Sequence, residues 1–150
     1  MIKIARCGAK EAVTAAFEVV VPEAVRHEAT MEAFADGVLI AVNVAAGRVR
    51  VRQAPADPPE ARVLPPGGER SVYALAAQRP AARIVSDDRR FIRRLAMLGQ
   101  TAQTPATLLV ALAARHVAPR PVILGWLELL RPLVSRIEYD AARVALKEVR

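Results

Sequence analysis

The chain has 150 residues, of which 53% are hydrophobic, and it carries a formal charge of +7 at pH 7. That length corresponds to one domain, and that apolar content excludes a disordered chain. A single cysteine and two histidines exclude a disulfide framework and a structural zinc site. No apolar stretch reaches membrane-spanning length and the N-terminus lacks a signal-peptide core, so the sequence predicts a cytoplasmic protein without a membrane partner.

The first third of the chain alternates between helical and strand patterns. Residues 11–17 have the apolar spacing of a helix, and residues 19–21 are an all-apolar run typical of a buried parallel strand. Pro22 suits the first turn of a following helix, because that turn leaves its N–H groups unpaired. Residues 36–47 have strand propensity, but the segment begins with Asp and ends with Gly, so we predict a capped helix. Residues 48–52 alternate arginine with valine, as in an edge strand.

The rest of the chain begins with a loop and then becomes mostly helical. Residues 54–67 are rich in proline and form the longest predicted loop, and residues 83–86 are a short predicted strand. Thr104 is a predicted N-cap, and Ser135 is predicted to form a capping box with Glu138. The helices predicted in this part run from residue 68, through 91–98, over 104–114, from 121, and from 135 towards the C-terminus.

Short apolar strands separated by helices predict an α/β fold with a mainly parallel sheet, because parallel strands need crossover connections. We expect residues 19–21 and 83–86 to be parallel neighbours in a central sheet with helices on both faces, which makes three layers. We expect a single domain.

Four acidic residues fall at the ends or starts of predicted elements. Asp87 and Asp88 follow a strand directly, where open parallel sheets collect ligands, and Glu69 opens a helix. Glu28 lies on the helix that follows Pro22. Converging carboxylates are hard oxygen ligands for Mg²⁺ or Mn²⁺. Taken singly, however, an acid at a helix start also serves as a cap, and a helix-borne glutamate is usually solvated.

Four arginines follow the acidic pair on one predicted helix, and they are Arg89, Arg90, Arg93 and Arg94. Guanidinium groups bind RNA phosphates well, so these arginines are candidate RNA-binding residues. The alternative is a solvated basic face, since arginines are spread along the whole chain.

Three segments occur in an order that resembles the PIN domain family, in the branch near VapC-type toxins. They are VVVPEAVRHEA (19–29), GGERSVYALA (67–76) and IVSDDRRF (84–91), in which a Gly-Glu-led helix precedes a strand that ends in Ser-Asp-Asp. TPATLLVALAARHV (104–117) is similar to the element that follows the acidic pair in this family. The resemblance covers about residues 10–118, and it implies that these residues are the core of the domain and that residues 119–150 are a C-terminal helical tail.

The resemblance implies a metal-dependent endoribonuclease that acts on RNA. It also implies that the protein could be the toxin of a toxin–antitoxin pair, with an antitoxin protein as its partner. It implies that Glu28 matches the acid of the family's second helix and that Glu69 matches the third acidic position. The fourth position matches Asp87 or Asp88, which the sequence leaves unresolved. Glu69, Asp87 and Asp88 are then the implied ligands of Mg²⁺ or Mn²⁺.

One position departs from the family pattern. The family's first strand normally ends in an Asp that anchors the metal, whereas residues 1–5 contain no acid. Either the reading frame begins further upstream, or this first ligand is lost, and we expect weak RNA cleavage by the 150-residue chain. The alternatives are a catalytically inactive PIN-like module that binds protein or RNA, and a structural domain that self-associates as a homodimer through the helices around Trp126.

Overall fold

The structure is a computed structural model that describes residues 2–31 and 35–149, with the backbone alone at 28–31, 35–37, 39 and 40. Two compact units are present. Unit 1 combines Met1–Glu18 with Thr104–Arg150, and unit 2 is Val19–Gln103. The boundary expected at residue 118 therefore does not coincide with the boundary of a unit, because the helix after Thr104 groups with the C-terminal helices.

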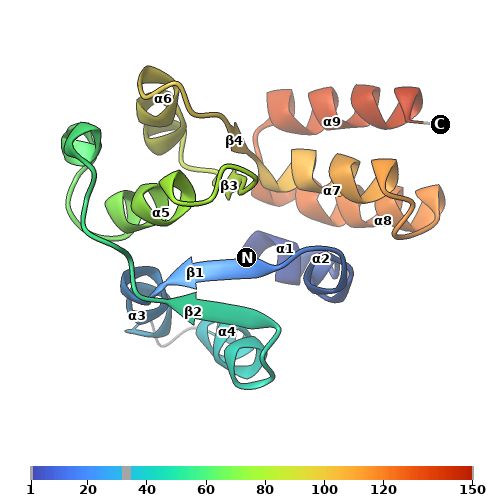
Figure 1. The fold of residues 1–150 in the computed structure, drawn as a ribbon. Helices are drawn as coiled ribbons and strands as arrows, with labels where there is room; N and C mark the ends of the chain where they lie inside the picture. The colour runs from blue at the N-terminus through green and yellow to red at the C-terminus, as the bar shows by residue number, and fades with distance from the viewer. Residues whose placement is uncertain (1, 32–34, 150) are drawn as a thin grey trace. The chain divides into compact units, whose positions relative to one another are not determined.

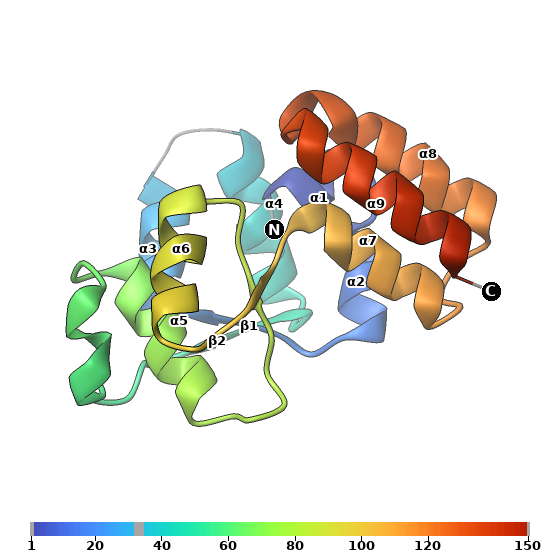
Figure 2. The ribbon, with the colours of Figure 1, turned by 90° about the horizontal axis from the view of Figure 1, so that it is seen from above.

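The regular elements in the described residues of unit 1 are all helices. Its helices are α1 (Ile2–Arg6), α2 (Lys10–Ala16), α7 (Pro105–Ala114), α8 (Arg120–Leu130), the 3₁₀ turn η2 (Arg131–Leu133) and α9 (Arg136–Glu148). Helices α7, α8 and α9 pack against one another and lie side by side in both views (Figure 1, Figure 2). The core is built from leucines at helical spacing, with Leu109, Leu112 and Leu127 almost fully buried.

The start of α7 confirms the predicted cap. The Thr107 N–H donates to Thr104 Oγ1 at 3.3 Å, and the Thr104 N–H donates to Thr107 Oγ1 at 2.7 Å. Ser135 also caps α9, but Glu138 does not complete the predicted box. Its Oε1 accepts from the Ala106 N–H at 3.3 Å, so tertiary packing uses this carboxylate at the start of α7.

Unit 2 is mixed α/β, and its strands form two parallel pairs. Its elements are β1 (Val19–Pro22), α3 (Glu23–Met31), α4 (Ala35–Ala45), β2 (Val49–Arg52), η1 (Pro59–Val63), α5 (Gly68–Ala77), β3 (Ile84–Val85), α6 (Arg89–Met97) and β4 (Ala102–Gln103). Strand β1 pairs with β2, in the register Val19 to Val49, and β3 pairs with β4. The predicted α/β class and parallel pairing are therefore confirmed.

The prediction that residues 19–21 and 83–86 are neighbours in one sheet is wrong. Each strand pairs instead with the next strand along the chain, across one or two intervening helices. The crossover argument requires parallel pairing of strands joined by helices, but it does not say which strands pair. Both β1 and β3 contact α5, so this helix packs on both pairs.

Helix α4 confirms the helical prediction for residues 36–47. It ends where Gly47 adopts a φ of 69°, a left-handed conformation that glycine accepts at little cost. The Gly47 N–H donates to the Val44 carbonyl at 3.0 Å, and the Arg48 N–H donates to the Asn43 carbonyl at 2.9 Å. This pair of hydrogen bonds closes the helix and allows β2 to start.

The core of unit 2 lies beneath a segment that the sequence presents as a loop. Within residues 54–67, the turn η1 and its flank bury Ala61 and Leu64 almost completely. These two side chains belong to one apolar cluster whose other buried members are Tyr73, Ile84, Phe91 and Leu95. The cluster fixes α5, β3 and α6 against each other, and these three elements carry most of the predicted site residues.

Candidate functional site

Glu69 lies in the first turn of α5. Gly67 precedes the helix with a φ of 110°, which turns the chain sharply and lets the helix begin at Gly68. A carboxylate in the first turn is stabilised by the helix dipole. Glu69 Oε2 accepts a hydrogen bond from Arg94 Nη1 of α6 at 3.1 Å, and the two side chains are 26% and 37% exposed.

Asp88 is the N-cap of α6. Its Oδ1 accepts from the backbone N–H groups of Arg90 at 2.7 Å and Phe91 at 3.0 Å, and its own N–H donates to Ser86 Oγ at 3.1 Å. The hydrogen bonds from Phe91 and Arg90 hold the pKa of Asp88 below its usual range, and the charges of Arg90 and Arg94 lower it further. The cap function that the sequence allowed for Asp88 is thus present.

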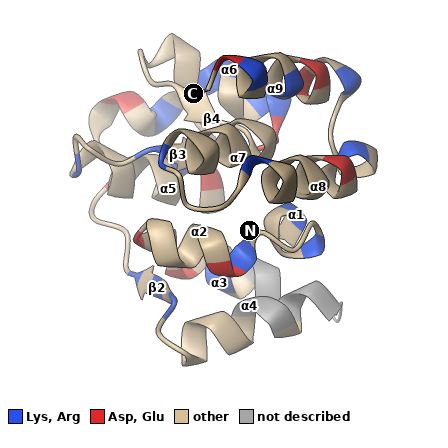
Figure 3. Ribbon diagram, turned by 90° about the vertical axis from the view of Figure 1, so that its right-hand side faces the viewer, with Lys and Arg blue, Asp and Glu red and all other residues tan. Residues whose placement is uncertain are grey.

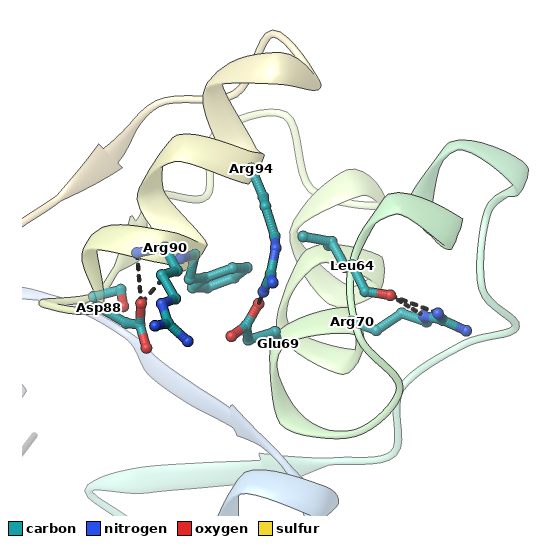
Figure 4. Close-up of polar contacts among 8 residues, drawn as sticks. Leu64, Glu69, Arg70, Asp88, Arg90 and Arg94 are labelled. Carbon is teal, nitrogen blue, oxygen red and sulfur yellow. Dashed lines mark hydrogen bonds and ion pairs between the residues drawn. The ribbon is translucent and has the colours of Figure 1, made fainter.

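Glu69, Asp88, Arg90 and Arg94 form a charge cluster, in which Asp88 caps α6, Arg90 lies in its first turn and Arg94 lies in its last turn (Figure 4). Arg94 contacts Glu69 directly, and its charge is a minor cause of the lowered pKa of Asp88. The two carboxylates are 19 positions apart in the sequence and belong to different helices. The Arg94–Glu69 ion pair therefore joins the helix that carries Glu69 to the helix that Asp88 caps, and Asp87 is an exposed neighbour of Asp88.

The arginines of α6 divide into two kinds. Arg89, Arg90 and Arg93 are exposed, whereas Arg94 is partly buried in its ion pair. Arg89 and Arg90 occupy the first turn, where the helix dipole disfavours positive charge, and they follow directly on the acidic Asp87–Asp88 pair. Basic residues also occur on helices of both units, which keeps the solvated-face alternative open for α6 (Figure 3).

Glu28 lies in α3, but its side chain is outside the described part of the chain. Its predicted convergence with Glu69 and the Asp87–Asp88 pair therefore stays a prediction.

Carboxylates of this cluster are the donor type that Mg²⁺ or Mn²⁺ prefers. Within residues 2–31 and 35–149, no three His, Cys, Asp or Glu side chains are grouped so that they could hold one ion. The cation that contacts Glu69 in this arrangement is the Arg94 guanidinium. Carboxylate oxygens are therefore suitable ligands for a hard divalent ion, but in this structure the Glu69 carboxylate is paired with Arg94.

Arg70 is a structural part of this region that the sequence did not single out. Its Nε donates to the Leu64 carbonyl at 3.1 Å (Figure 4). Its Nη1 lies 3.5 Å from Asp57 Oδ2. These contacts tie the segment before α5 to the helix that carries Glu69. The helix dipole disfavours an arginine in the first turn of a helix. The position of Arg70 in the sequence therefore indicated that its side chain has a tertiary partner.

Trp126 of α8 was the predicted centre of a self-association surface. Its side chain is partly buried within unit 1, where Cδ1 and Nε1 of the indole lie 3.7 Å from the position of a Cβ added at Gly8. The indole therefore packs near Gly8, which follows α1 in the same unit. Self-association through Trp126 stays a prediction.

None of the helices within residues 2–31 and 35–149 combines the length and the apolar character that a membrane crossing requires. No protein-family description matches the chain, and neither a curated protein nor a solved structure was found to be similar to it.

Proposed function

We propose that the protein has a PIN-like, three-layer fold and is a cytoplasmic metal-dependent endoribonuclease, regulated as a toxin by an antitoxin protein. The observation that supports this proposal is the Arg94–Glu69 ion pair, which joins the helix that carries Glu69 to the helix that Asp88 caps. These acids come from two of the segments on which the family resemblance rests. A phosphodiester-cleaving site of this type would need both carboxylates to reach one ion, and capping alone does not require an ion pair between the two helices.

The acidic residues and the arginines would have different roles. Glu69, Asp88 and the exposed Asp87 would hold Mg²⁺ or Mn²⁺, which when bound activates water and stabilises the departing oxygen. Arg89, Arg90 and Arg93 would hold the RNA phosphates beside them, because the guanidinium fork matches phosphate oxygens. Phosphate positioning is essential, since poor alignment of the attacking water costs much of the rate.

Cleavage of a labelled RNA by the 150-residue chain with Mn²⁺ tests this proposal. We expect slow cleavage that Glu69→Gln abolishes. Glu60→Gln is the matched control, because Glu60 is an acid of unit 2 that contacts the Tyr73 hydroxyl at 3.5 Å outside the charge cluster. Cleavage that survives Glu69→Gln would come from a contaminant or another site. If the gene encodes a further upstream strand that ends in Asp, the extended chain should cleave faster.

A second candidate, a catalytically inactive PIN-like module that binds RNA, is favoured by the partners of the two acids. Glu69 is paired with Arg94, and Asp88 Oδ1 accepts two backbone hydrogen bonds. RNA binding in the presence of EDTA separates the candidates, because this module needs no metal. Arg89→Gln and Arg93→Gln should each reduce the slope of log affinity against log salt by about 1. Arg120→Gln in unit 1 is the control and should leave that slope unchanged.

A further inference from the structure

Helix α9 has a row of apolar side chains on its exposed side. Ile137 is 80% exposed, Val144 is 56% exposed, and Ala141, which lies between them, is exposed as well. Their spacing of four and then three residues places these three side chains, the α9 stripe, in one line along the helix. The buried residues of α9 lie on its other side, where the helix packs against α7 and α8. Single exposed apolar residues are common, but a row with heptad spacing is the pattern by which two helices pair.

Charged residues border the α9 stripe, and all of them are exposed. Asp140 and Lys147 lie along one side of it, seven residues apart, and Glu148 continues the row at its C-terminal end. Arg136 and Arg143 lie further round the helix on the same side as Asp140. Arg136 Nε lies 3.5 Å from Asp140 Oδ2, but the two side chains are 93% and 56% exposed, so water screens this ion pair and it is weak. The charge of Asp140 is therefore available to a partner.

A second copy of α9 complements this surface when the two helices run antiparallel. With position 141 of one copy opposite position 144 of the other, Asp140 lies beside Lys147 of the second copy, because the flanks that carry them face each other in such a pair. Two-fold symmetry makes this attractive contact occur twice. The same register brings Glu148 near Arg136 of the second copy. Parallel pairing instead places Asp140 beside Ala145 of the second copy, and the attraction is lost.

We propose that the α9 stripe is a self-association surface, which pairs antiparallel with the same stripe of a second copy, with Asp140 and Lys147 joined across the pair. This inference does not depend on the proposed nuclease function. It also differs from self-association through Trp126, whose indole packs within its own unit. One helix face is smaller than the about 1,200 Å² that stable interfaces bury, so the dimer is weak, with a Kd on the order of 10–100 µM.

Sedimentation velocity of the full chain at about 5–500 µM, which brackets that Kd, measures the association. We expect a concentration-dependent shift from monomer to dimer. Ile137→Ser removes an exposed apolar side chain that the second copy buries, so it should weaken dimerisation at least about tenfold. Leu129→Ser is the matched control, because Leu129 is 60% exposed on α8 of the same unit, and it should leave the Kd unchanged.

Exchange of the two flanking charges tests the antiparallel register. Asp140→Lys places lysines of opposite copies side by side, and Lys147→Asp does the same with aspartates. Each should weaken dimerisation about fivefold, since two contacts become repulsive in each dimer. The double variant Asp140→Lys/Lys147→Asp restores opposite charges and should dimerise within about twofold of the unmodified chain. An equimolar mixture of the two single variants should form dimers that contain one copy of each. Circular dichroism verifies that every variant is folded.

A chain that stays monomeric at about 500 µM would overturn the proposal. A dimer that Ile137→Ser and Leu129→Ser weaken equally would overturn it as well, because α9 would then not be the surface involved. A double charge variant as weak as the two single variants would overturn the antiparallel pairing. Weakening by Ile137→Ser and by each single charge variant, with recovery in the double variant, would support the proposal.

Discussion

Helices α6 and α7 follow each other in the chain, but they differ in how many of their residues are buried and how many are charged. Six of the ten residues of α7 are buried, and none of its residues is charged. Two of the nine residues of α6 are buried, namely Phe91 and Leu95, while four are arginines. Helix α7 is therefore held by apolar burial along most of its surface, whereas α6 is held by two apolar anchors and a charged cap. The difference leaves the surface of α6 available for binding.

The two helix starts show the same contrast. Thr104 and Thr107 satisfy the start of α7 with neutral hydroxyl groups. Asp88 satisfies the start of α6 with a carboxylate beside Arg90 and Arg94. Both caps serve the same N–H groups, but only the cap of α6 adds charge to a surface that could bind a ligand.

The largest expected effect is a core truncation in α7. Leu112 is fully buried, so Leu112→Ala should lower the free energy of unfolding of unit 1 by about 2–5 kcal/mol. Leu129→Ala on α8 is the matched control, because Leu129 is 60% exposed, and it should change stability by less than about 0.5 kcal/mol. Urea unfolding followed by fluorescence of the single tryptophan, Trp126 in unit 1, measures both. Equal effects would mean that the burial of a leucine side chain does not decide how much it contributes to stability.

Removal of the caps should have an intermediate effect on both helices. Thr104→Ala and Asp88→Ala should each cost about 0.5–2 kcal/mol, because each leaves N–H groups of a first turn without an acceptor. Far-UV circular dichroism during urea unfolding reports the Asp88 variant, and Trp126 fluorescence reports the Thr104 variant. Asp88→Asn keeps a side-chain oxygen at the cap and should recover much of the loss. A full loss in Asp88→Asn would show that charge, and not cap geometry, stabilises α6.

The smallest expected effect separates the two caps by their pH dependence. Since the folded-state pKa of Asp88 is lowered, its charge stabilises the protein above its unfolded-state pKa of about 3.9. That contribution disappears as the pH falls through the lower, folded-state value. The stability difference between the unmodified chain and Asp88→Asn should thus be constant near neutral pH and shrink below about pH 4. Thr104→Ala should show no such trend, and a trend of equal size would contradict the contrast between the helices.

Much of the local structure was predictable because its causes lie within a few residues. Thr104 before a proline, Ser135, and Gly47 after an apolar run predicted helix boundaries that the structure confirms. Caps and left-handed glycines act through hydrogen bonds that span three to five residues, so the sequence contains the whole interaction. The predicted convergence of Glu28, Glu69 and Asp88 stays a prediction, and the side chain of Glu28 lies outside the described residues.

Interactions between distant residues were decided by tertiary structure. Apolar runs predicted strands and parallel pairing, but β1 pairs with β2 and β3 with β4, because the sequence pattern of a short strand does not specify its partner. Glu138 has the spacing of a capping box, yet it accepts from Ala106, 32 residues away. Arg94 has the spacing of a solvated helical face, yet it pairs with Glu69 across 25 residues. Periodicity describes which face a side chain occupies, whereas packing of the apolar cluster beneath α5 and α6 decides what that face meets.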